Sequence, residues 1–337
     1  MLNNKNIKIF LNYWLGPIIF GWLAWSIYHQ VKSQPDLYAS WNTINSALNG
    51  NQAWKFWMVL FLMAVNWSIE ARKWAELLAP LYPVSFARSM KAILAGLAFA
   101  VNTPNRIGEY GGRVIYLPEG KRLQAVSLTL IGSYSQLLVT VVLGSAGLWI
   151  FNSSVLPLNA ANNWQSYTIW IRLLSVVMTT ISVLLLLVYL RISWLVRFVE
   201  KIPGIEKWGR VLMVVDHLPV RILLRVLGWS MFRYVIFVIQ YILLLQCFGV
   251  TNDIWMTWWM ISILFLALAI VPTVALAELG IRGKLALELF GWLSANQLGI
   301  ITATFSIWIV NLVLPAVLGS LLILRIKIFS TRAPQVK

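Results

Sequence analysis

Two stretches of the sequence combine charged residues with proline and glycine, although long apolar runs surround both. The first is 102–113, NTPNRIGEYGGR, and the second is 271–283, VPTVALAELGIRG. Proline and glycine interrupt a helix, and an interrupted backbone at membrane depth persists only where protein or a wet cavity surrounds it. Two broken apolar segments in corresponding halves of a chain are typical of a transporter binding site.

Four charged residues in the two breaks carry the expected chemistry: Arg106, Glu109, Glu278 and Arg282. Each unpaired charge at the centre of a membrane helix costs about 2.5 to 3.5 kcal/mol. In one interpretation Arg106 pairs with Glu109 and Glu278 pairs with Arg282, so that both pairs only hold the turns in place. In the other, the arginines face a cavity and hold an anionic headgroup, ideally a phosphate, while the glutamates orient them or carry protons.

Side chains beside the breaks complete the expected substrate-binding site. Three of them are suited to replace hydrogen bonds lost at the prolines: Asn102, Thr103 and Thr273. Arg113 and Lys284, just past the breaks, extend the basic lining. Helix N-termini after Gly112 and Gly283 would add amide donors for an anion, and the Gly108–Gly112 spacing permits close helix packing. The residues expected to shape the breaks are Pro104, Gly108, Gly112, Pro272, Gly280 and Gly283.

The composition predicts an integral membrane protein. Hydrophobic residues make up 60% of the chain and charged residues 11%, and the mean hydropathy is +0.76. The net charge is +16, but the Lys and Arg residues lie between apolar runs. We therefore interpret them as topology signals and contacts with anionic lipids, and expect no nucleic-acid partner. One cysteine and two distant histidines predict no disulfide framework, no metal site and no cofactor.

The apolar runs predict six spanning helices, at about 9–28, 54–69, 124–150, 167–190, 230–248 and 300–324. We also expect a short interfacial helix near 41–48. The apolar run 92–101 is too short to cross, because ten helical residues cover roughly 15 Å of a core of about 30 Å. Basic residues stand on both sides of it, so we expect 85–122 to form a re-entrant hairpin from the cytoplasmic side and 255–294 to form one from outside.

The expected fold is therefore all-α, a single transmembrane domain of residues 1–337. Its halves, 1–160 and 161–330, are candidates for inverted-topology repeats. The basic residues at 70–74, at 191–233 and at the C-terminal end predict cytoplasmic segments, with both termini in the cytoplasm and the protein in the plasma membrane. The segment 191–233 is also suited to contact the inner leaflet.

Several of these motifs resemble a known family. NW at 66–67, EARKW at 70–74, Gly96, TPNRIGE at 103–109 and the late Pro272 with ELGIRG at 278–283 are similar to the membrane domain of lysylphosphatidylglycerol synthases/flippases. The resemblance implies an integral membrane fold and movement of a lipid between leaflets. It covers most of residues 55–325 in layout. Because the sequence ends at Lys337 without the soluble synthase domain of that family, we do not expect it to aminoacylate lipids.

We expect a flippase that moves an anionic or lipid-linked amphiphile through a polar cavity, with phospholipids, glycolipids and polyprenyl phosphates as open alternatives. No ATP-binding motif is present, so passive exchange and gradient coupling through Glu109 or Glu278 both remain open. An intramembrane enzyme would need an acid and a base. However, the sequence has no His-Glu-x-x-His or Gly-x-Ser-x-Gly motif, and we expect no enzyme. An accessory scaffold for a membrane enzyme is the main alternative.

Overall fold

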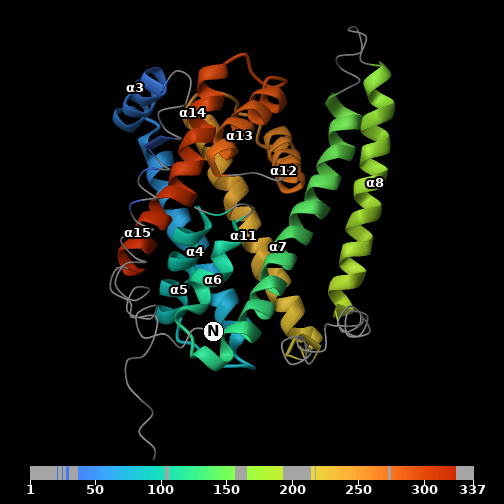
Figure 1. The fold of residues 1–337 in the computed structure, drawn as a ribbon. Helices are drawn as coiled ribbons and strands as arrows, with labels where there is room; N and C mark the ends of the chain where they lie inside the picture. Colours follow the sequence, from blue (N-terminus) through green and yellow to red (C-terminus); the bar gives the residue numbers. More distant parts are fainter. Residues whose placement is uncertain are drawn as a thin grey trace, which may run out of the picture.

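The computed structural model describes residues 21, 25, 28–29, 37–101, 103, 106–155, 165–192, 214–216, 218–271 and 275–323, with only the backbone for 37, 48, 155, 165–167 and 275–278 (Figure 1). Within these residues every regular element is a helix, which confirms the all-α expectation. The first predicted span, 9–28, lies largely outside the described residues. A helix does form near the predicted interfacial helix at 41–48.

The larger helices are α3 (Leu37–Asn49), α4 (Ala53–Leu78), α5 (Phe86–Ala100), α6 (Gly108–Val114), α7 (Arg122–Ile150), α8 (Gln165–Leu190), α11 (Val220–Cys247), α12 (Ile254–Ile270), α13 (Ala275–Phe290), α14 (Gln297–Trp308) and α15 (Leu314–Ile323). The 3-10 helix η2 (Glu119–Lys121) precedes α7. Two π-helical segments, η3 (Phe151–Val155) and η6 (Ile309–Val313), follow α7 and α14.

Four helical segments in the described residues are long and apolar enough to cross a bilayer: Glu119–Ser154, Thr168–Leu190, Val220–Cys247 and Gln297–Ile323. They correspond to four of the six predicted spans, and they identify a membrane protein. In α8 only 17% of the most apolar 18-residue window is buried, because this helix packs mainly against α7 at the side of the bundle (Figure 1). The 26-residue helix α4 is also long, but it carries buried charges.

One order of elements occurs twice in the chain. The long helix α4 is followed by the short helices α5 and α6 and then by α7, and the long helix α11 is followed by α12 and α13 and then by α14 to α15. The members of each short pair pack against each other. Figure 1 shows α5 and α6 toward the lower end of the bundle and α12 and α13 toward its upper end. The two broken segments thus lie in two short-helix pairs at opposite ends.

The second break is narrower than the sequence predicts. Helix α13 already begins at Ala275, so Gly280 and Gly283 lie inside a helix, and a Cβ atom on either would meet no atom within 4 Å. In the same way α6 begins at Gly108 and contains Gly112. The predicted helix N-termini after Gly112 and Gly283 are therefore wrong. In α13 the surrounding Ala, Leu and Glu residues favour a helix, and isolated glycines weaken a helix without ending it.

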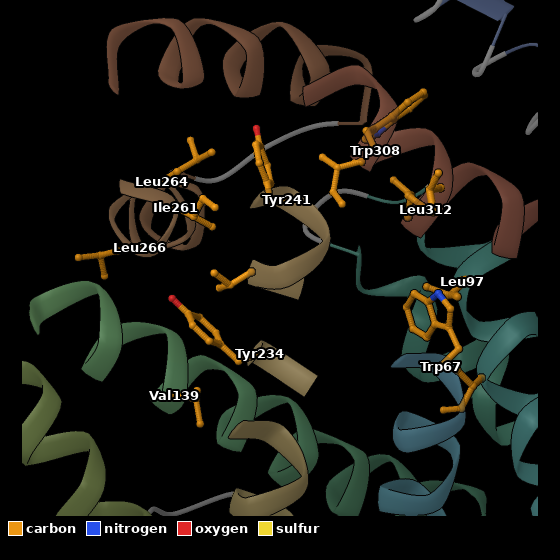
Figure 2. Packing of buried hydrophobic residues seen from close by; sticks show 14 of the residues in the cluster. Trp67, Leu97, Val139, Tyr234, Tyr241, Ile261, Leu264, Leu266, Trp308 and Leu312 are labelled. Atoms are coloured by element: carbon orange, nitrogen blue, oxygen red, sulfur yellow. The ribbon is translucent and has the colours of Figure 1, made fainter. Parts of the chain in front are cut away.

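A buried apolar core joins the elements around the two short-helix pairs. It includes Trp67 of α4, Leu97 of α5, Tyr234 of α11, Leu264 of α12 and Trp308 of α14, and Figure 2 shows these side chains in the interior. The packing is closest where glycines face a neighbouring helix, as small residues do in membrane bundles. The site described next lies where this core becomes polar.

Candidate functional site

A cavity of about 310 Å³ brings residues of the two breaks together. Arg106 and Glu109 line it from the first break, and Arg282 lines it from α13. The other charged lining residues are Glu70, Lys73, Arg113 and Arg233. Among the described residues, five cationic and two anionic side chains give the lining a formal net charge of +3. Such a cavity favours an anionic ligand.

Glu70 is the centre of the charged cluster. Its side chain on α4 is buried at 2% exposure. One carboxylate oxygen, Oε1, accepts a hydrogen bond from Nη1 of Arg113 at 2.8 Å. The other, Oε2, lies 2.8 Å from Nζ of Lys73 and accepts from Nη1 of Arg233 at 2.5 Å. A single buried carboxylate thus joins three cations from α4, α6 and α11, and each of these ion pairs is shielded from water.

Neighbouring polar groups hold Lys73 in place. Its Nζ donates to the carbonyl oxygen of Gly132 at 3.3 Å and to Oγ of Ser230 at 3.4 Å, and the Ser230 hydroxyl is 2.7 Å from that of Ser135. These contacts join α4 to α7 and α11. Buried polar groups are stable when they are hydrogen-bonded in this way.

Arg233 is fixed on three sides. Its Nε donates to Oδ1 of Asn66 at 2.9 Å, and its guanidinium lies 4.6 Å from the ring centre of Trp67 and 5.4 Å from that of Phe237. Nδ2 of Asn66 in turn donates to Oδ1 of Asn311 at 3.5 Å, which reaches the π-helical segment η6. Trp67, Phe237 and Asn311 all line the cavity. Cation–π contacts and hydrogen bonds therefore orient the arginine toward Glu70.

Arg113 connects the first break to this cluster. It is 3% exposed, and it contacts Glu109 through Nη2 while Nη1 contacts Glu70. Glu109 and Arg113 are four residues apart on α6, and the Glu109 side chain is 20% exposed. The carboxylates of Glu109 and Glu70 thus both bind the guanidinium of Arg113. This arrangement fixes α6 against α4.

The backbone of the first break is unusual at Arg106, where φ is +57°. Residues other than glycine adopt this left-handed conformation only at a cost, and such residues cluster at functional sites. Thr103 supports the turn, since its Oγ1 accepts from the amide of Gly108 at 2.8 Å and lies 3.2 Å from the carbonyl oxygen of Phe99. Thr103 thus serves the backbone and does not line the cavity.

The second break contributes one predicted residue to the lining, Arg282. Lys284 is exposed and does not line the cavity, in contrast to its expected role. Four predicted residues lie outside the described part of the chain, and their roles stay predictions: Asn102, Pro104, Pro272 and Thr273. The same holds for the side chain of Glu278.

The sequence analysis missed Glu70, Lys73 and Arg233 as site residues. It interpreted 70–74 as a cytoplasmic exit and placed Arg233 in a basic cytoplasmic segment, and it did not anticipate that Glu70, Lys73 and Arg233 are buried. Helix α4 continues to Leu78 and α11 begins at Val220, so these charges lie within helices, where their mutual pairing permits burial. The spacing of Asn66, Glu70 and Lys73 was the available signal, because residues i, i+4 and i+7 share a helix face.

Glycines fix the position of Arg113 by allowing α5 and α6 to touch. A Cβ atom on Gly112 would lie 2.7 Å from Cα of Gly96 and 2.9 Å from the carbonyl oxygen of Ala95. The neighbouring Gly111 has open space, with nothing within 4 Å. The spacing of Gly108 and Gly112 thus gives the close packing that it predicts.

This contrast yields a test with a matched control. We expect Gly112→Ala to lower the free energy of unfolding by about 1 to 3 kcal/mol, because the added methyl separates α5 from α6. Gly111→Ala should raise it by about 0.5 to 1 kcal/mol, since alanine is the better helix former. Thermal unfolding of the two purified variants in one detergent measures both. Equal effects of the two changes would contradict the observed packing.

Comparison with known proteins adds no assignment. No protein-family model matches the chain, and a search of curated proteins finds no similar sequence. The resemblance to lysylphosphatidylglycerol synthases/flippases stays a prediction. Within the described residues, His, Cys, Asp and Glu nowhere gather in threes as a metal site would require. The charged groups that line the cavity are guanidinium, ammonium and carboxylate groups, and hydroxyl and amide side chains accompany them.

Proposed function

We propose that the protein moves a lipid with an anionic headgroup between the leaflets of a membrane. The observation that supports this proposal is that one cavity collects arginines from both broken segments, Arg106 and Arg282, and that its described lining residues have a formal charge of +3. Guanidinium groups bind phosphate through paired hydrogen bonds, and they keep their charge when partly buried. A cationic cavity among membrane-length helices lowers the cost of bringing a phosphate into the bilayer.

The cavity volume matches a headgroup better than a whole lipid. A volume of about 310 Å³ corresponds to on the order of ten water molecules and lies at the lower end of ligand-binding pockets. Acyl chains would remain in the bilayer while the headgroup occupies the cavity. In this proposal Arg106 and Arg282 contact the phosphate, and Glu70 keeps Lys73, Arg113 and Arg233 in position.

The proposed orientation places the ends of α4 and α5 that meet near residues 79–85 in the cytoplasm. Basic residues outnumber the acidic Glu76 and Glu119 at the adjoining helix ends, where they are Arg88, Lys91, Lys121, Arg122, Arg221 and Arg225. Positive charge marks the cytoplasmic side of membrane proteins. The short helices α5 and α6 would then enter from the cytoplasm and α12 and α13 from outside, as two re-entrant hairpins of a plasma-membrane protein.

A leaflet-exchange assay tests the proposal. Purified protein is placed in liposomes that contain fluorescent phosphatidylglycerol, and dithionite quenches the outer leaflet. We expect the wild type to accelerate loss of the protected signal, and we expect Arg106→Gln and Arg282→Gln each to slow it about tenfold, the value of one charged hydrogen bond. Lys284→Gln is the matched control, because Lys284 is on α13 but outside the cavity.

Equal rates of leaflet exchange for Arg282→Gln and Lys284→Gln would show that the lipid does not pass through the cavity. If the wild type accelerates leaflet exchange of neither fluorescent phospholipids nor fluorescent polyprenyl phosphates, the transport proposal is wrong. A scaffold for a membrane enzyme would then be the better hypothesis.

A further inference from the structure

A second hollow lies on the surface between α4 and α11. Its volume is about 430 Å³, and its lining residues are Glu76, Arg225, Gly228, Trp229 and Phe232. None of these residues lines the central cavity. We call this hollow the α4–α11 groove. It needs an explanation of its own, because the transport proposal does not use it.

Both charged and exposed apolar side chains surround the groove. Arg225 precedes Arg233 of the central cluster by eight residues, which corresponds to about 12 Å along α11 toward its basic N-terminal end. Large apolar side chains beside it are exposed, with Leu224 at 53% and Phe232 at 51%. A charged hollow next to exposed apolar side chains is the environment of a lipid headgroup at the membrane surface.

The groove carries both an anion and a cation. Trp229 donates from Nε1 to Oε2 of Glu76 at 3.2 Å, and Nε of Arg72 lies 3.7 Å from Oε1. The Glu76 side chain remains 25% exposed, and a carboxylate has further acceptor positions for another donor. Arg225 is exposed at the other charged position of the lining. The groove therefore complements a ligand with one negative and one positive group.

Space for such a ligand comes from Gly228. A Cβ atom at this position would meet no atom within 4 Å, so no neighbouring side chain fills the groove above it. The indole of Trp229 adds an aromatic ring, which attracts a ligand cation through its face. The described residues thus provide a phosphate contact, an ammonium contact and room between them.

We propose that the α4–α11 groove binds the headgroup of a zwitterionic phospholipid with a primary ammonium group, such as phosphatidylethanolamine. The phosphate contacts Arg225, the ammonium donates to Glu76 beside Trp229, and an acyl chain lies along Phe232. Binding here does not depend on lipid movement through the central cavity. Failure of the transport proposal would therefore leave this inference standing, and the reverse also holds.

Native mass spectrometry of the full chain in detergent tests the groove. Dioleoyl-phosphatidylethanolamine and dioleoyl-phosphatidylglycerol are titrated separately, and the bound fraction is measured. The wild type should prefer the ethanolamine lipid. Arg225→Gln and Gly228→Leu should each weaken its binding about tenfold, through loss of a charged hydrogen bond and through filling of the groove respectively. Arg221→Gln, an exposed arginine on α11 outside the lining, should bind like the wild type.

Glu76→Gln tests recognition of the ammonium group separately from recognition of the phosphate. It should abolish the preference for the ethanolamine lipid while binding of the glycerol lipid stays unchanged. Equal wild-type binding of the two lipids, or stronger binding of the glycerol lipid, would overturn the ammonium site. Unchanged binding in Gly228→Leu would overturn the groove as the location, since a Cβ atom at this position meets no atom within 4 Å and the rest of the side chain extends from it.

Discussion

Replacement of Glu70 by glutamine is expected to lower the free energy of unfolding by about 3 to 5 kcal/mol, the usual result of removing one partner from a buried ion pair. The carboxylate lies against Lys73, Arg113 and Arg233 at 2.5 to 2.8 Å, and all four side chains are at least nine-tenths buried. Glutamine keeps the size of the side chain but leaves three cations close together without their shared anion. Their repulsion should separate α4 from α6 and α11.

Thermal unfolding of purified protein in detergent measures this effect. Glu76→Gln is the control, because Glu76 lies on the same helix and is 25% exposed. The double variant Glu70→Gln, Arg233→Gln should regain part of the loss, since it removes one of the cations that the Glu70→Gln substitution leaves without the carboxylate. If Glu70→Gln unfolds at the same temperature as Glu76→Gln, the cluster does not stabilise the fold.

The second large effect is expected at Gly319. A Cβ atom at this position would lie 1.8 Å from the carbonyl oxygen of Leu94 and 2.4 Å from its carbonyl carbon. Both atoms belong to the backbone of α5, so no side-chain movement can relieve the contact. Gly319→Ala should therefore cost about 3 kcal/mol, the upper part of the usual range for overpacking. It should also shift α5, which packs against α6 in the first short-helix pair.

The same unfolding measurement, with Gly280→Ala as control, tests this contact. A Cβ atom on Gly280 meets nothing within 4 Å, although that glycine is also helical. The control should unfold at or slightly above the wild-type temperature. Wild-type stability of Gly319→Ala would show that α5 and α15 do not touch as described.

The sequence predicted the all-α fold class and the charged residues of the two broken segments, but it did not predict the buried cluster around Glu70. Proline, glycine and charge within apolar runs identified Arg106, Glu109, Arg113 and Arg282, and all four line one cavity. Their spacing alone could not give the cavity, because its walls come from helices distant in sequence. Whether these residues bind a substrate stays a prediction.

The centre of the cluster was missed for a physical reason. Charges near the end of an apolar run normally indicate the membrane surface, and Glu70, Lys73 and Arg233 met that rule. Their burial depends on partners 43 to 163 residues away, such as Arg113 and Arg233 for Glu70. Pairwise contacts at such separation are not encoded in any local pattern. Only the shared helix face of Asn66, Glu70 and Lys73 pointed to them.

The π-helical segment η6 has a consequence for helix phase. A π turn holds one residue more than an α turn, so it acts as a one-residue insertion that rotates the following helix by about 100°. Tyr241 contacts Thr304 before this insertion, Asn311 within it reaches Asn66, and Gly319 after it faces α5. A continuous α-helical wheel over 297–323 would place these contact faces out of register. Deleting one residue in η6 would thus misalign α15 with α5 while leaving α14 unchanged.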